Sequence, residues 1–168
     1  MSDTIAAIST PTGESAIASV RLSGPECAEI ARAVFGAAEI PARRVNYGLY
    51  RDLSGASIDD AVFCLYRAPA SYTGEDMLEI FPHGNPFILR KILEDLSRRG
   101  ARLAEPGEFT RRAFLNDAAR GVFSAAERSS AKGRRFFAAS KSAREASRIV
   151  SRMSLIVLKI LRGRRALR

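Results

Sequence analysis

The chain has 168 residues, 46% of them hydrophobic, and a formal net charge of +9. This apolar content is enough for a packed core and excludes a wholly disordered chain. The two cysteines, Cys27 and Cys64, lie in apolar contexts without CxxC spacing, which argues against a disulfide framework or a zinc site and for a reducing compartment.

The positive charge is confined to the C-terminal third of the sequence. Residues 1–117 contain 13 basic and 16 acidic side chains, whereas residues 118–168 contain 14 basic and 2 acidic ones. A basic nucleic-acid-binding domain would carry its lysines and arginines on the fold itself, so this distribution argues against that class. We therefore expect a domain at residues 1–117, followed by a basic tail at residues 118–168.

Residues 1–117 are expected to alternate between strands and helices. Short apolar runs bounded by Gly, Pro and Ser predict strands, and apolar side chains three and four residues apart predict helices. In chain order we expect strands at 4–9 and 16–22, a helix at 25–35, strands at 45–51 and 60–66 joined as a hairpin, a strand at 77–81, a helix at 86–96, a strand at 101–104 and a helix starting at 107. This order predicts an α/β (α+β) fold, in which helices pack against a mixed β-sheet.

The tail differs in character from the domain. Residues 118–147 are rich in Ala, Arg, Ser and Lys, and apolar residues then recur at helical spacing at Ile149, Met153, Ile156 and Ile160. This pattern predicts a basic amphipathic helix, a type of segment that contacts nucleic acid or an anionic membrane. The alternative is a disordered or loosely helical extension without such a role.

Several functional motifs are missing from the sequence. It contains no GxxxxGKS or GxxxxGKT P-loop. The single histidine, His83, is too few for a metal site built on several histidines, and we expect it to satisfy a turn rather than to serve a Ser-His-Asp triad. No apolar stretch approaches the roughly 18 residues that a membrane span requires, and the first ten residues do not resemble a signal peptide. We therefore expect a cytoplasmic protein without a membrane span.

Two charged side chains interrupt apolar strands. Arg21 lies near the end of an expected strand, and Glu79 alternates with apolar neighbours in the strand at 77–81. An acid in such surroundings is a candidate for a partly buried polar contact. By contrast, Arg111 and Arg112, at the start of the last expected helix, are predicted to be solvated.

Three sequence segments together carry a family resemblance. They are TIAAISTPTGESAIASVRLSG near the N-terminus, then SYTGEDMLEIFPHGNP, then GARLAEPGEFTRRAFLND. With these segments, residues 3–117 resemble the N-terminal, tetrahydrofolate-binding and dimerisation domain of the MnmE (TrmE) family of tRNA-modification GTPases. The combination of PGEFTRRAFLN with YTGEDMLEI at this distance makes the resemblance specific.

The resemblance implies a role in tRNA modification. In the family, this domain dimerises and binds 5-formyltetrahydrofolate, the one-carbon donor for the wobble uridine of certain tRNAs, and the full-length proteins act with an FAD-dependent partner of the MnmG type. The resemblance does not extend to a G domain. We therefore expect no GTP, Mg²⁺ or K⁺ site in this chain, and no hydrolase activity from it alone.

The resemblance also assigns two folate-binding residues and no catalytic or metal-binding residue. Arg21 matches a folate-contacting arginine of the family, and Glu79 matches a folate-contacting glutamate. A guanidinium can hold a carboxylate or a carbonyl through two parallel donors, and a carboxylate can accept hydrogen bonds from a pterin edge. The family's lysine falls on Ala118, and Asn85 replaces a glycine, which is expected to alter the turn there. The alternative is a dimerising fragment that no longer binds folate.

The resemblance ends abruptly at Asp117. The family continues with a lysine and a helical segment rich in Gln, Glu and Ala, whereas this chain reads AARGVF. A shifted reading frame explains such an ending, and under it residues 118–168 carry no evolved function. A genuine alternative ending is the other explanation.

Overall fold

The computed structural model of the chain describes residues 3–11 and 13–119. These residues belong to one compact unit, Met1–Arg120. The expected basic helix around residues 149–160 lies outside the described residues. Within them, no helix is long and apolar enough to cross a membrane.

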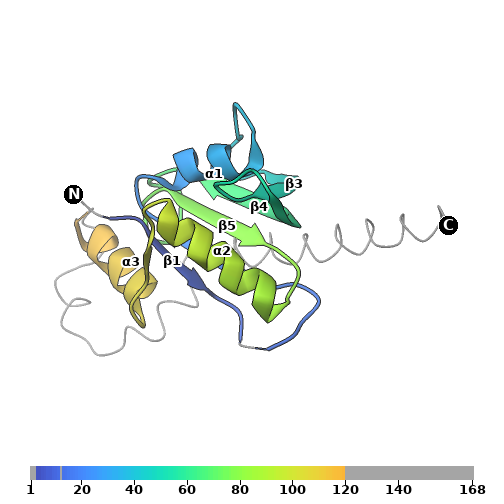
Figure 1. Ribbon diagram of the computed structural model, residues 1–168. Coiled ribbons are helices and arrows are strands. Elements are labelled where there is room, and N and C mark those ends of the chain that lie inside the picture. The colour runs from blue at the N-terminus through green and yellow to red at the C-terminus, as the bar shows by residue number, and fades with distance from the viewer. Residues whose placement is uncertain (1–2, 12, 120–168) are drawn as a thin grey trace. The chain divides into compact units, whose positions relative to one another are not determined.

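A six-stranded β-sheet forms the centre of this unit (Figure 1). Its spatial order is β3-β4-β5-β2-β1-β6, in which β1 and β6 are parallel and every other neighbouring pair is antiparallel. The strands are β1 (Ile5–Ile8), β2 (Val20–Ser23), β3 (Val45–Arg51), β4 (Ser57–Tyr66), β5 (Met77–Phe81) and β6 (Arg102–Leu103). The predicted mixed sheet is therefore confirmed.

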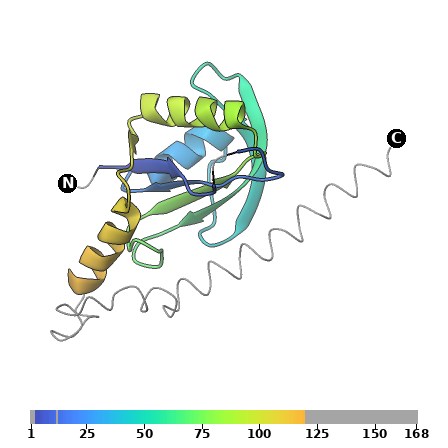
Figure 2. The ribbon, with the colours of Figure 1, turned by 90° about the horizontal axis from the view of Figure 1, so that it is seen from below.

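Two helices, α1 (Cys27–Phe35) and α2 (Pro86–Arg98), pack on one face of the sheet (Figure 2). Alternate strand residues, such as Leu22 of β2 and Ile80 of β5, form a single buried core with both helices. The alternation follows from strand geometry, since successive side chains point to opposite faces. A third helix, α3 (Glu108–Ala119), follows β6 and lies near the N-terminus.

The other face of the sheet carries the polar residues singled out in the sequence. Arg21 pairs in register with Glu79 on β5 and with Ala7 on β1, and Glu79 pairs with Cys64 on β4. These four residues form one row across four strands, on the side away from the core helices. The row places Arg21 and Glu79 side by side although 58 positions separate them in sequence.

Most expected elements are confirmed, and one is wrong over half its length. The strand expected at 16–22 begins only at Val20. The preceding residues run beside the loop before α2 instead: Ser15 bridges Gly84, and the Ala18 N–H donates to the Pro82 carbonyl. This approach requires glycine at position 84, because an added Cβ would lie 2.1 Å from the Ser15 hydroxyl oxygen.

The turn before α2 is a regular helix start that contains Asn85, and the expected change of this turn relative to the family stays a prediction. Asn85 has extended backbone angles (φ −99°, ψ 122°), and its side chain accepts a hydrogen bond from the Phe87 N–H at 2.8 Å. Pro86 occupies the first helical position, where its missing N–H costs nothing. Asn85 is therefore the N-cap of α2, a position at which asparagine is among the preferred residues.

The N-cap gives a first prediction. Asn85→Ala removes the side-chain acceptor and is expected to lower the free energy of unfolding by about 1 kcal/mol. Asn85→Asp keeps an acceptor beside the positive end of the helix dipole and is expected to leave stability unchanged. Urea denaturation followed by circular dichroism measures both, and equal stability of the two variants would contradict the capping role.

Candidate functional site

Arg21 and Glu79 bind each other directly. Nε and Nη2 of Arg21 donate to Oε1 of Glu79 at 2.9 and 2.6 Å. The Glu79 side chain is 6% exposed and the Arg21 side chain 26% exposed. A nearly buried carboxylate needs a charged or hydrogen-bonding partner, and Arg21 supplies it from the neighbouring strand while the outer part of its guanidinium remains accessible.

Tyr66, at the end of β4, completes the contacts of the carboxylate. Its hydroxyl donates to Oε2 of Glu79 at 3.2 Å. Burial, and then the negative charge of Glu79, raise the pKa of Tyr66 above its ordinary value. The hydroxyl therefore stays protonated and remains a donor. Glu79 is thus held from two strands, by a guanidinium on one side and a phenol on the other.

Two aromatic rings lie beside the guanidinium of Arg21. Its Cζ is 5.4 Å from the ring centroid of Tyr72 and 5.9 Å from that of Phe109. Tyr72 comes from the loop before β5, and Phe109 from the first turn of α3. Cations at this distance from aromatic rings are attracted by the ring quadrupole. The rings limit the directions from which another molecule can approach Arg21.

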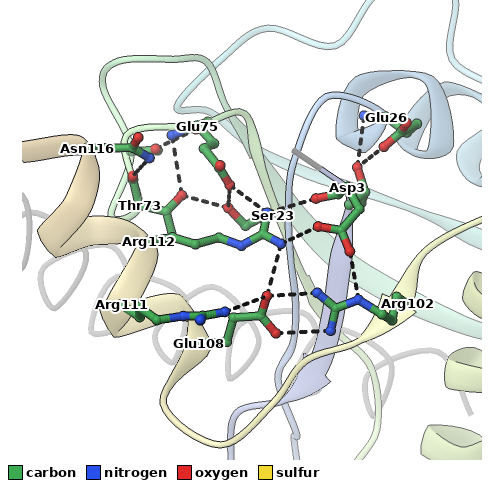
Figure 3. Close-up of polar contacts among 12 residues, drawn as sticks. Asp3, Ser23, Glu26, Thr73, Glu75, Arg102, Glu108, Arg111, Arg112 and Asn116 are labelled. Carbon is green, nitrogen blue, oxygen red and sulfur yellow. Dashed lines mark hydrogen bonds and ion pairs between the residues drawn. The ribbon is translucent and has the colours of Figure 1, made fainter. Parts of the chain in front are cut away.

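An ion-pair cluster, here the Arg112 cluster, joins α3 to the rest of the site (Figure 3). It consists of Asp3, Glu75, Arg102, Glu108 and Arg112. Arg112 donates to the Asp3 carboxylate at 2.6 Å, to the Asp3 carbonyl at 2.7 Å, to Glu108 at 3.0 Å and to Glu75 at 3.2 Å. Arg102 donates to both oxygens of Glu108 and to Asp3. The cluster therefore connects the N-terminus, the loop before β5, β6 and α3.

The two arginines of α3 behave differently, and the expectation that both are solvated is wrong for one of them. The Arg112 side chain is 10% exposed, whereas that of Arg111 is 62% exposed and makes only long ion pairs of 3.7 Å. Sequence spacing shows only one acceptor of Arg112, Glu108 four residues earlier on α3, whereas the other two come from remote segments. Among these, Asp3 lies 109 positions away.

Comparison with known proteins identifies the domain. A family model described as GTP-binding protein TrmE N-terminus matches residues 4–118. The chain belongs to this family. It is 52% identical over 116 residues to the tRNA modification GTPase MnmE of Opitutus terrae, and 51% identical over 117 residues to that of Aquifex aeolicus.

Each of these matches covers 69% of this chain but only 25% and 26% of the two relatives. The chain thus spans about a quarter of the length of the relatives it matches. Residues 4–118 are therefore a TrmE N-terminal domain.

Both residues assigned from the resemblance lie side by side in this TrmE N-terminal domain and form an ion pair. Sequence reasoning brought Arg21 and Glu79 forward separately and did not foresee that they bind each other. It missed Tyr66, Tyr72 and Phe109. The one signal for Tyr66 is its place two residues after Cys64, on the same face of a strand. Tyr72 and Phe109 lie inside the motifs SYTGEDMLEI and PGEFTRRAFLN, but nothing local shows that chain folding brings both rings to Arg21.

Two other positions were named from the sequence. Position 118, to which the resemblance assigns a lysine in the family, falls in the last turn of α3. His83 has a 55% exposed side chain, and its Nδ1 lies 2.9 Å from Oδ1 of Asp59, whose other oxygen accepts from the His83 N–H. This pairing fixes the turn after β5, the structural role expected for His83.

The Arg112 cluster leads to a pH prediction. Hydrogen bonds from Arg102, the Glu105 N–H and Arg112 lower the pKa of Glu108 to about 2. Because the folded-state pKa lies below the unfolded value of about 4.3, ionised Glu108 stabilises the fold above that pH. The contribution is lost as the pH falls towards 2.

We expect the difference in free energy of unfolding between the wild type and Glu108→Gln to be constant above about pH 5 and to close between pH 4 and 2. Denaturation at a series of pH values measures it. Glu105→Gln is the matched control, because the Glu105 side chain is 68% exposed and its ion pair with Arg111 is long, at 3.7 Å. A difference that does not vary with pH would contradict the assigned role of Glu108.

Proposed function

We propose that this domain binds 5-formyltetrahydrofolate at the Arg21–Glu79 pair. The observation that carries the proposal is a charged hydrogen-bonded pair on the sheet face opposite α1 and α2, with its carboxylate nearly buried and its guanidinium partly accessible beside two aromatic rings. Ligand sites commonly combine apolar walls with a few fixed polar groups. The pair and the two rings provide both.

The hydrogen-bonding capacity of the site suits a folate. Nη1 of Arg21 makes no hydrogen bond to any residue between 3 and 119 that the structure describes, so it can donate to a carbonyl or carboxylate of the ligand. Glu79 accepts three hydrogen bonds, whereas a carboxylate has about four lone-pair sites. One acceptor position is left for an N–H of a pterin. Tyr72 and Phe109 offer ring faces to the flat heterocycle.

We take the cellular process in which this binding occurs from the family. We propose that residues 1–117 act as a cytoplasmic homodimer in tRNA wobble-uridine modification, with the bound folate supplying the one-carbon unit and an MnmG-type protein and tRNA as partners. The relatives from Opitutus terrae and Aquifex aeolicus, named tRNA modification GTPases, support this setting. The part played by this chain's own residues is to bind and orient the donor.

Calorimetric titration with 5-formyltetrahydrofolate tests the proposal. Arg21→Ala and Glu79→Ala are each expected to weaken binding at least about ten-fold, because truncating one member of a hydrogen-bonded charge pair costs about 2 kcal/mol or more. Arg21→Lys keeps the charge but not the forked donor, so it is also expected to bind more weakly than the wild type.

A matched control separates the site from general loss of charge. Arg67→Ala breaks an ion pair of the same 2.6 Å length with Asp76, in which the Arg67 side chain is 50% exposed, and is expected to leave the affinity unchanged. Circular dichroism confirms that each variant is folded. A wild-type chain that does not bind, or equal affinities for the wild type, Arg21→Ala and Glu79→Ala, would refute the proposal.

A second candidate function is dimerisation without folate binding. Ala118 favours it, because the family's lysine at that position is replaced by a residue without a cation. The apolar side chains of Leu49, Leu53, Phe87 and Leu115 are 45% to 59% exposed, so each is available to a partner.

Analytical ultracentrifugation combined with the titration distinguishes the two functions. We expect a dimer that binds folate, and we expect Ala118→Lys to strengthen binding without changing the sedimentation coefficient, since it adds a cation that can pair with a folate carboxylate. A dimer with no folate affinity in either form would favour the second candidate. A monomer that binds folate would contradict dimerisation in both candidate functions.

A further inference from the structure

The loop before β5 and helix α3 are tied together at three points. Arg112 donates to Glu75 at 3.2 Å, the Asn116 side chain donates to the Thr73 carbonyl at 2.7 Å, and the hydroxyls of Tyr72 and Thr110 lie 3.3 Å apart. The loop and the helix are the two segments that bring aromatic rings to Arg21. Their contact with each other therefore sets the positions of both rings.

Of the residues that join the loop to α3, Arg112 makes the most contacts. It contacts three separate carboxylates, those of Asp3, Glu75 and Glu108 (Figure 3). Glu75 is fixed in turn by the Ser23 hydroxyl at 2.7 Å, at the end of the strand that carries Arg21. A continuous path of polar contacts thus runs from β2 through Glu75 to α3.

Removing the guanidinium would do more than delete one contact. Glu108 is 2% exposed, and the Glu75 side chain is 17% exposed. Without Arg112, the carboxylates of Asp3, Glu75 and Glu108 would lose a shared cation, and like charges in a low-dielectric setting repel. Arg102 would still compensate Glu108 and Asp3, but no cation would remain between Glu75 and α3 among the contacts of the described residues.

We propose that Arg112 is a positioning residue for the folate site, which holds Tyr72 and Phe109 beside the guanidinium of Arg21. Phe109 lies three residues before Arg112 on α3, and Tyr72 three residues before Glu75 on the loop. Arg112 therefore acts on both rings through the two carboxylates it joins, Glu108 and Glu75, without touching the ligand. This inference rests on the proposed function for its effect on binding, but its structural part does not.

A tryptophan reporter tests the structural part. The chain has no tryptophan, so Phe109→Trp creates a single emitter at the ring position next to Arg21. In this background, Arg112→Ala and Arg112→Lys are expected to shift the emission towards that of solvent-exposed tryptophan, because the ring is released from the site. Arg111→Ala, one position away and 62% exposed, is the matched control and is expected to leave the emission unchanged.

Titration with 5-formyltetrahydrofolate tests the functional part. Arg112→Ala and Arg112→Lys, each without the reporter, are expected to bind about ten-fold more weakly than the wild type at a temperature where circular dichroism shows them folded, and Arg111→Ala within about two-fold of it. Glu75→Gln removes the charge on the loop and keeps its shape, so it decides the question if Arg112→Ala does not fold. The same loss of affinity is expected for it.

Each outcome decides something. Unchanged emission in the folded Arg112 variants, or unchanged affinity in Arg112→Lys and Glu75→Gln, would overturn the positioning role. If the wild-type chain binds no folate, the proposed function fails, whereas the emission shift still decides whether Arg112 holds Phe109 in place. Equal losses in Arg111→Ala and Arg112→Ala would show a general charge effect and would also overturn the inference.

Discussion

The burial of the Glu79 carboxylate is the constraint on which the polar half of this domain depends. Both core helices cover one face of the sheet, so the central strands need other cover on the opposite face. Glu79 lies there with 4% exposure. An ionised group so far from water is tolerated only with partners. Arg21 and Tyr66, on the strands at either side of β5, are those partners.

Further contacts surround the Arg21–Glu79 pair. Arg21 partly neutralises Glu79 and is itself flanked by Tyr72 and Phe109, on a loop and a helix that the sheet does not hold. The Arg112 cluster attaches these two segments to the N-terminus and to β2. The domain thus has an apolar core on one face of the sheet and two linked charge networks on the other, and the proposed binding site belongs to the face with the charge networks.

Much of the fold could be read from the sequence, because its elements are short and have clear ends. β3 and β5 have the predicted bounds, and α1 ends at Gly36 in the left-handed conformation that glycine favours. The missed half of the strand at 16–22 shows the limit of such reading. Its alternation suits a strand, but Ser15 and Ala18 find their partners in the loop around Gly84, and that approach is a tertiary event.

The sequence by itself determined the family and the fold class, and it brought forward Arg21 and Glu79 as candidate site residues, because motifs and strand alternation are local properties. Only the tertiary structure decided that these residues bind each other, that Tyr66 completes the carboxylate's contacts, and that Arg112 is largely shielded while Arg111 is exposed. The physical reason is that burial and electrostatic pairing depend on segments brought together from as far apart as Asp3 and Arg112. Local spacing carries no information about such distant partners.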